Sequence, residues 1–325
     1  MNLKSVAFRA VLPLAVLFSL GTAPLAFAQP SNAKLVVGFT PGGPIDAVAR
    51  IISTQLGHEL GVNMIVENRA GANAGLAAEY VAKAEPDGRT LFLTSTGAVA
   101  ISPSLYEKLS FNPVRDFEPV SLVVSTDEVF VVGAKHPAND VKEFIAYANK
   151  QNRGAAIASS GTGSIPHLAA ELFADVTGIK MVHVPYKGVA PAITDVIAGH
   201  VDGIFIDIPV ALAHIKAGNL KALGLAAPQR HATLPTTKTF QEVGIKGVDS
   251  SNWYAIYAPK GTPVAELDRI NQAIRRTLAN PTVKNAMLAI GAEPSPSTRA
   301  DLGKLLKSDL DKWQRVIRDK KITAD

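Results

Sequence analysis

Three short segments of the chain combine glycine, hydroxyl and free backbone N–H groups in patterns suited to binding an anion. The first runs from Phe39 to Asp46 and reads FTPGGPID. Gly42 and Gly43 allow a tight turn, and Pro44 suits the first position of a helix, where its missing N–H costs nothing. Asp46 then falls in the first turn, near the positive end of the helix dipole, and is more typical of a cap than of a ligand group. Free N–H groups at a helix start bind carboxylates or phosphates, although a well-capped helix without a ligand explains the same pattern.

The second segment, residues 159–167, reads SSGTGSIPH and also precedes a predicted helix. Ser164 is a suitable N-cap, and Pro166 falls in the first turn, where proline is tolerated. The hydroxyl and N–H groups of this segment are neutral donors that can hold an anion without a buried cation. The alternative is a hydrolase with Ser164 or Ser160 as nucleophile and His167 as base, but the G-x-S-x-G pattern of a nucleophile elbow is absent.

The third segment is residues 183–188, which read HVPYKG. Tyr186 offers a flat wall and a hydroxyl, and Lys187 offers positive charge, although a solvated surface position is the simpler explanation for this lysine. Further along, Asp207 follows an apolar strand. It is suited either to select a ligand amine or hydroxyl, or to cap the helix that begins near Pro209.

No metal or cofactor site is predicted. The chain has no cysteine, which excludes disulfides and thiolate ligands. The ending of a nucleotide-binding P-loop is missing after Gly43. Apart from His167, the histidines show no spacing typical of metal ligation; they are His58, His136, His183, His200, His214 and His231.

The candidate segments fall at junctions between predicted strands and helices. Apolar runs of strand length alternate with helical spacing, which predicts an α/β fold with parallel sheets and helices on both faces. In such sheets ligands bind beyond the carboxyl ends of the strands. The polar clusters at these junctions are 40–46, 95–97 (which contains Thr96), 159–167 and 186–188. Strands are predicted at 34–39, 90–95, 155–159, 181–184, 201–206 and 220–226. Helices are predicted at about 45–56, after a cap at Asp140, and at 165–176, 264–278 and 299–318.

The first residues predict export. Lys4 and Arg9 precede an apolar run at 10–27, and Ala26-Phe27-Ala28 is a signal-peptidase pattern, so we expect cleavage before Gln29. A membrane anchor is the alternative, but the run is short and is broken by two prolines and a glycine. No later span is predicted.

Composition adds broad limits. Removing 28 of the 325 residues leaves 297, enough for two domains. The formal net charge falls from +5 to +3, because the removed segment holds two basic residues and no acid. This weak positive charge does not indicate nucleic-acid binding, and it suits a small anionic ligand.

At this point the chain resembles the receptors of tripartite tricarboxylate transporters, also called the Bug family. The resemblance covers nearly the whole mature chain, in order. It rests on PGGPIDAVAR (41–50), VENRAGANAG (66–75), PDGRTLFL (86–93), SPSLYEKLSFNPVRDFEPV (102–120), SSGTGSIPHLAAELF (159–173), HVPYKGVAPAITDVIAGHVD (183–202), HIKAGNLKAL (214–223) and YAPKGTP (257–263).

The resemblance implies a two-lobed periplasmic binding-protein fold of type II character, with two crossing hinge strands. One lobe is then 29–127 plus 250–325, and the other is 128–249. It implies a periplasmic receptor, not an enzyme. The receptor holds a small carboxylate through backbone amides and waters and delivers it to membrane permease subunits. A sensor that presents its ligand to a signalling protein is the alternative. The choice of carboxylate and the oligomeric state stay open.

The junction 95–97 adds Thr96, and the positions that match the family supply the other ligand-binding candidates. Together they are Phe39, Gly42, Gly43, Pro44, Asp46, Thr96, Ser159, Ser160, Thr162, Gly163, Ser164, His167, Tyr186, Lys187, Gly188 and Asp207. Two positions depart from the family pattern. Many relatives place an aspartate directly after the phenylalanine of the strand, where Ile206 stands here and Asp207 follows. A shift of one residue turns a strand side chain to the opposite face, so the approach of Asp207 to the cleft stays open. At Ile45, relatives commonly carry a small or hydroxyl residue.

Overall fold

The computed structural model describes residues 31–71, 74–106, 108–186 and 188–323. The predicted signal segment, 1–28, lies outside the described residues. No helix within them is both long and apolar enough to cross a membrane. The strands are β1 (Asn32–Val37), β2 (Asn63–Asn68), β3 (Thr90–Ser95), β4 (Phe117–Gly133), β5 (Ala155–Ser159), β6 (Met181–Pro185), β7 (Gly203–Asp207), β8 (Leu220–Ala226) and β9 (Ser251–Pro259). The helices are α1 (Pro44–Leu60), α2 (Gly75–Ala82), α3 (Ser102–Leu105), α4 (Val141–Lys150), α5 (Ile165–Thr177), α6 (Val189–Ala198), α7 (Ile208–Lys216), α8 (Val264–Ala279), α9 (Pro281–Ala289) and α10 (Arg299–Lys320), with short helical turns η1 (Gly97–Ile101) and η2 (Gln241–Val243).

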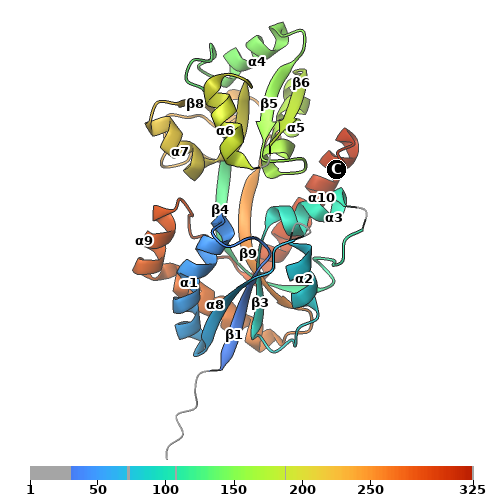
Figure 1. The fold of residues 1–325 in the computed structure, drawn as a ribbon, viewed down its shortest axis with the longest axis vertical. Helices are drawn as coiled ribbons and strands as arrows, with labels where there is room; N and C mark the ends of the chain where they lie inside the picture. Colours follow the sequence, from blue (N-terminus) through green and yellow to red (C-terminus); the bar gives the residue numbers. More distant parts are fainter. Residues whose placement is uncertain (1–30, 72–73, 107, 187, 324–325) are drawn as a thin grey trace, which may run out of the picture. The chain divides into compact units, whose positions relative to one another are not determined.

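The strands form two sheet regions that share β4. The first sheet region has the order β2-β1-β3-β9-β4, and β4 pairs with β9 there as far as Asp127. From Glu128 onward β4 instead pairs with β7 and β8, and β5 and β6 continue this second sheet region. Figure 1 shows β4 and β9 side by side between the two regions. The chain therefore crosses between its two halves on extended backbone.

The expectation of wholly parallel sheets is wrong for the crossing strands. β1 is parallel to β2 and β3, and β5 is parallel to β6 and β7, as predicted. β9 is antiparallel to β3, and β4 is antiparallel to β7, β8 and β9. A parallel neighbour needs a crossover connection, whereas an antiparallel neighbour does not. Strands that leave one region for the other have no such crossover, so their direction is opposite.

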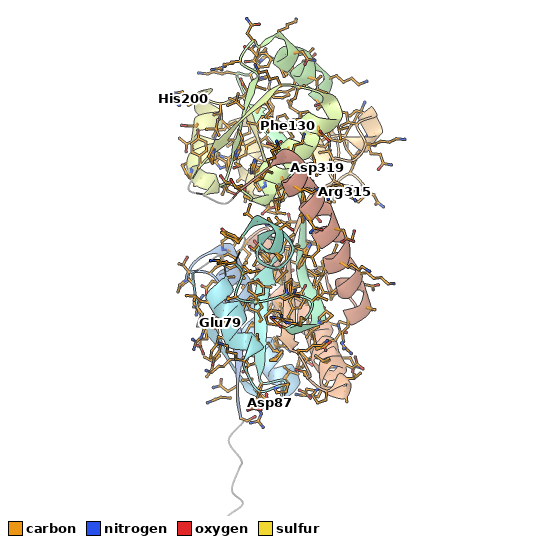
Figure 2. All side chains as sticks on the ribbon, turned by 90° about the vertical axis from the view of Figure 1, so that its right-hand side faces the viewer. Glu79, Asp87, Phe130, His200, Arg315 and Asp319 are labelled. Carbon is orange, nitrogen blue, oxygen red and sulfur yellow. The ribbon has the colours of Figure 1, made fainter. Side chains whose placement is uncertain are left out.

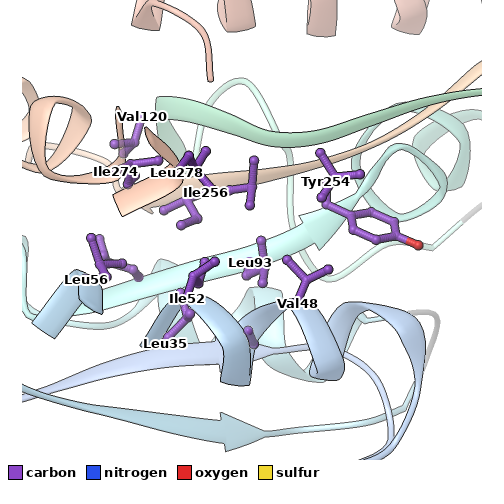
Figure 3. Packing of buried hydrophobic residues seen from close by; sticks show 14 of the residues in the cluster. Leu35, Val48, Ile52, Leu56, Leu93, Val120, Tyr254, Ile256, Ile274 and Leu278 are labelled. Carbon is purple, nitrogen blue, oxygen red and sulfur yellow. The ribbon is translucent and has the colours of Figure 1, made fainter. Parts of the chain in front are cut away.

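Apolar residues cover both faces of each sheet region. Leu35 and Val37 of β1 face one cluster and Val36 faces another, following the period of two along a strand. Val129 and Phe130 of β4 divide in the same way between two clusters in the second sheet region. Figure 3 shows the cluster that packs α1 and α8 against the first sheet region. Helices therefore lie on both faces, as predicted.

The predicted helix signals also hold. The apolar residues at helical spacing in α1 are buried; the helix starts at Pro44 and ends at Leu60, and Gly61 caps it in the left-handed conformation. Ser164 caps α5 by accepting a hydrogen bond from the His167 N–H at 3.4 Å. Asp140 caps α4 in the same manner. The start of α1 therefore fixes the end of the first polar loop, before Pro44, and the start of α5 fixes the end of the second polar loop, before Ile165.

Helix α10 links the two sheet regions on a second route. Trp313 and Ile317 of α10 belong to the same buried cluster as Ile165 and Leu168 of α5. The Lys320 Nζ also lies 2.7 Å from an oxygen of Asp175, near the end of α5. In Figure 2, Arg315 and Asp319 mark the part of α10 that extends to the second sheet region. The helix that carries the second polar loop therefore rests partly on α10.

Candidate ligand-binding site

A cavity of about 640 Å³ lies where the start of α1 and the start of α5 face one another. The α1 side contributes Phe39, Thr40, Gly43, Pro44 and Ile45. The α5 side contributes Ser160, Gly161, Thr162, Gly163, Ser164, Ile165 and Pro166. The remaining wall consists of Ser95, Gly97, Leu105, Tyr106, Asn252 and Tyr254. No charged side chain lines this cavity among the residues that the structure describes, so a ligand anion there meets neutral donors.

Several backbone N–H groups of the lining residues are without a protein acceptor in the described part of the chain. Ile45 and Ile165 lie in first helical turns, where the N–H has no helical partner. In the second loop the N–H groups of Ser160 and Thr162 are also unpaired, whereas those of its neighbours are hydrogen-bonded within the loop. Unpaired N–H groups from both helix starts thus belong to one cavity, as an anion site requires.

Asp46 holds the first loop in shape and does not line the cavity. Its carboxylate accepts hydrogen bonds from the Gly42 N–H at 2.8 Å, from Arg50 Nε at 2.9 Å and from Asn68 Nδ2 at 2.9 Å. Asn68 Nδ2 also donates to the Phe39 carbonyl at 3.1 Å. The hydrogen bond from Arg50, followed by those from Gly42 and Asn68, lowers the pKa of the buried carboxyl to about 2. Asp46 is therefore a charged anchor of the loop.

A pair of stacked histidines holds the second loop. The rings of His167 and His183 lie 3.6 Å apart between centroids and are within 5° of parallel. His167 Nδ1 accepts a hydrogen bond from the Gly163 N–H at 3.0 Å, so the proton of its neutral ring lies on Nε2. His183 Nε2 lies 2.6 Å from Ser159 Oγ, which itself accepts from the Gly161 N–H at 3.1 Å. Burial, with a smaller effect of His167, lowers the pKa of His183 to about 4.

This network leaves His167 unsuited to act as a base for Ser164 or Ser160. Its Nδ1 is occupied by the Gly163 N–H, and its Nε2 lies 3.5 Å from Glu171 Oε1. The link between His167 and Ser164 runs through the histidine backbone N–H, which is a helix cap. The spacing that first suggested a hydrolase is therefore the spacing of a capping turn.

Comparison with known proteins identifies the family. Residues 48–322 match the family described as tripartite tricarboxylate transporter family receptor. The chain belongs to this family. It is 33% identical over 287 residues to the protein BugT of Bordetella pertussis, and the match covers 88% of each chain. The family is described as one of transporter receptors, so the chain is a receptor of this kind and not an enzyme.

Two solved structures of similar proteins match the fold of this chain. MatC (Rpa3494) from Rhodopseudomonas palustris with bound malate is 30% identical, with a TM-score of 0.74, and the match covers 88% of this chain and 99% of that one. The R. palustris protein Rpa4515 with adipate is 30% identical with a TM-score of 0.77, and the match covers 90% and 98%. The predicted family and its binding-protein fold are confirmed.

The cavity of about 640 Å³, called the receptor cavity below, is lined by about half of the predicted site residues. Those that line it are Phe39, Gly43, Pro44, Ser160, Thr162, Gly163 and Ser164. Gly42 and Asp207 line a smaller cavity of about 250 Å³ that shares Gly43, Pro44 and Tyr254 with the first. Contact with a ligand stays a prediction for all of them.

Other predicted residues lie behind or away from the lining of the receptor cavity. Thr96 is buried, and its hydroxyl bonds to the backbone of Trp253. Tyr186 donates its hydroxyl to Asp195 at 2.6 Å, and burial together with Asp195 raises its pKa to about 12. Gly188 has a positive φ of 110° just before α6. Ser159 and His167 support the loop, as described above, and Lys187 lies outside the described residues.

The residue patterns missed two cavity residues on β9. Asn252 and Tyr254 line the receptor cavity from a strand that the apolar pattern did not predict. The alternation of exposed and buried positions at 251–254 is weak, because β9 is nearly buried throughout. Among the described residues, no group of three or more acidic or histidine side chains is placed to hold a metal ion.

Proposed function

We propose that the receptor captures a small carboxylate in the 640 Å³ cavity and delivers it to the permease of a tripartite tricarboxylate-type transporter. The observation that carries this proposal is the meeting of two helix starts at a cavity with unpaired N–H groups and no charged lining among the described residues. The malate and adipate bound to two relatives support the same ligand class.

Binding uses neutral donors from both loops. One carboxylate oxygen accepts from the N–H groups around Ser160 and Thr162, and the α1 start around Ile45 completes the cradle from the opposite side. Bridging waters fill the remaining positions at a cost of only about 0–2 kcal/mol each. Because charge is stabilised without a buried cation, release needs no strong ion pair to be broken. We expect a Kd from low micromolar to below micromolar, roughly −8 to −10 kcal/mol.

The capture involves closure of two lobes, which we propose to be 29–127 plus 250–325 and 128–249. Among the described strands, only β4 runs through both sheet regions, and the chain returns to the first region at the start of β9, so small dihedral changes near Asp127 and Ser251 can rotate one sheet region against the other. A carboxylate that contacts both loops binds the closed form better and shifts the population toward it. The site of action that we propose is the periplasm, after removal of 1–28.

The test is thermal unfolding of residues 29–325 against a panel of malate, adipate, citrate, aspartate and benzoate. The protein is first unfolded and refolded to remove carried-over ligand. An acid at 100-fold over its Kd stabilises the protein by about 2.7 kcal/mol, which raises the midpoint by a few degrees. A shift restricted to one class of acid supports the proposal, and no shift with any acid contradicts it.

A further inference from the structure

Two carboxyl groups lie opposite each other where β4 changes partner. Asp127 is the last residue of β4 paired with β9, and Glu128 is the first paired with β7. The cross-strand partner of Glu128 is Asp207, at the end of β7. Directly opposed residues project from the same face with Cβ atoms about 4.5–5.5 Å apart. Like charges at such a position repel each other, so the pair calls for a physical explanation.

Each carboxyl group has one oxygen without a donor among the described residues. Glu128 is 1% exposed; its Oε2 accepts from Ser250 Oγ at 2.9 Å, and its Oε1 is buried and unpaired. Asp207 accepts a long hydrogen bond from Asn252 Nδ2 at 3.4 Å through Oδ2, and its Oδ1 is buried and unpaired. A buried carboxylate without a counter-charge is unstable. A proton on the pair removes one charge and supplies the missing donor.

Within the described part of the chain, no basic side chain forms an ion pair with Glu128 or Asp207; the nearest lysine contact in this region is Lys312 Nζ, 3.3 Å from Asp249. On β4, Asp127 adds a further acid, and on β9 the facing groups are the neutral Asn252 and Tyr254. The β8 partner of Glu128 is Ala226. Beyond Asp127 lie three more titratable groups, Asp249, Glu293 and His231, of which the last two pair with each other at 3.4 Å.

Electrostatics agree with this geometry. Burial raises the pKa of Asp207 to about 7, and burial together with Asp207 raises the pKa of Glu128 well above its usual range. Burial also raises the pKa of Asp127 to about 6. Protons are therefore bound here in the folded protein at a pH where they would be lost from the unfolded chain.

The pair adjoins the proposed ligand site. Asp207 lines the 250 Å³ cavity, which shares Gly43, Pro44 and Tyr254 with the receptor cavity. Asn252, which donates to Asp207, lines the receptor cavity itself. A negative charge on Asp207 is therefore close enough to oppose a bound carboxylate through a region of low polarity.

We propose that Glu128 and Asp207 share a proton and that this pair couples carboxylate capture to proton uptake. The inference rests on the proposed function, because the coupling acts on the same cavity. The proton-bearing pair admits the carboxylate, and the ionised pair opposes it. A receptor of this kind holds its solute more tightly on the acidic side of neutrality and releases it more readily on the basic side.

The first test needs no ligand. Asp207 binds its proton more tightly when folded, so its contribution makes stability fall as pH rises from about 4 to about 7. Urea unfolding of residues 29–325 between pH 4.5 and 7.5 should show this fall, and Asp207→Asn should make it shallower, leaving only the smaller fall due to Glu128 and Asp127. Asp319→Asn, at an acid that is 53% exposed and far from the pair in α10, is the matched control and should keep the wild-type slope. If Asp207→Asn has the wild-type slope, there is no shared proton. Glu128→Gln serves as a second variant should Asp207→Asn fold poorly.

The second test measures the coupling with malate as the probe. Isothermal titration at pH 7 in two buffers of different ionisation enthalpy gives the number of protons taken up. We expect a clear fraction of a proton taken up by wild type, about none by Asp207→Asn, and an affinity about tenfold weaker at pH 8 than at pH 6. Binding without proton uptake refutes the inference and leaves the proposed function standing. Failure of every acid in the panel refutes the proposed function, while the urea experiment still decides whether the proton is shared.

Discussion

Replacing Gly163 with alanine tests whether the two sides of the cavity must touch for ligand capture. Gly163 has a φ of +73°, and a Cβ built there would lie 2.3 Å from Cδ2 of Leu105, which lies at the end of α3 in the remaining wall of the cavity. Carbon atoms pack at about 3.5–4.0 Å, so Leu105 must move by more than 1 Å or the walls must separate. The backbone adds about 1 kcal/mol for a non-glycine residue in the left-handed region.

Gly178 provides the matched control. Its φ is +69°, and nothing lies within 4 Å of its added Cβ, so Gly178→Ala carries the same backbone cost without the contact. We expect both variants to lose about 1 kcal/mol of stability in urea unfolding. We expect malate, or the best acid of the panel, to bind Gly163→Ala about tenfold more weakly, which corresponds to about 1.4 kcal/mol. The control should bind within twofold of wild type.

A double variant sharpens the reasoning. Leu105→Ala removes the atoms that the new Cβ meets, so Gly163→Ala combined with Leu105→Ala should recover most of the lost affinity relative to Leu105→Ala alone. If Gly163→Ala binds like the control, or if the double variant recovers nothing, then contact between these walls is not part of capture.

Three further changes probe the loops. Asp46→Asn should lower the free energy of unfolding by about 2–3 kcal/mol, since a charged acceptor of three hydrogen bonds is lost. Because the pKa of Asp46 is lowered to about 2, the stability advantage of wild type should disappear as pH falls below about 4. A stability difference that stays constant down to pH 2 in urea unfolding would contradict the assignment. His183→Gln should weaken acid binding several-fold at pH 7 with little change in urea midpoint, as measured by titration calorimetry; unchanged affinity would show that the stacked pair does not shape the loop. Ser164→Ala should lower stability by about 1 kcal/mol through loss of the α5 cap, measured by urea unfolding, and a loss below 0.3 kcal/mol would speak against the cap.

The sequence allowed the capped helix starts to be predicted, because their signals are local. Pro44, Ser164 and the glycines beside them specify turns within a few residues of themselves, and the structure has them where the pattern indicated. The meeting of the two starts in one cavity followed from the position of helices after strands. These features depend on short-range geometry, which sequence alone carries well.

The crossing strands and their side chains could not be predicted in this way. β4 and β9 are buried along most of their length, so they lack the alternation that marks a strand with one wet face. Asn252 and Glu128 both lie against Asp207, which is far from each of them in the sequence. His183 is similar, because its stacking partner and its hydrogen-bond partner come from a different strand and helix.

The packing of α10 beneath α5 bears on how binding preferences can be moved between relatives. The loop at 159–164 stands on a helix whose buried face includes Ile165 and Leu168, and these share a cluster with Trp313 and Ile317 of α10. If the loop and α5 of a relative were transferred without that relative's C-terminal helix, α5 would pack against a helix whose side chains do not match it. Recombination that exchanges the α5 segment together with α10 should therefore give working hybrids more often than exchange of either piece alone.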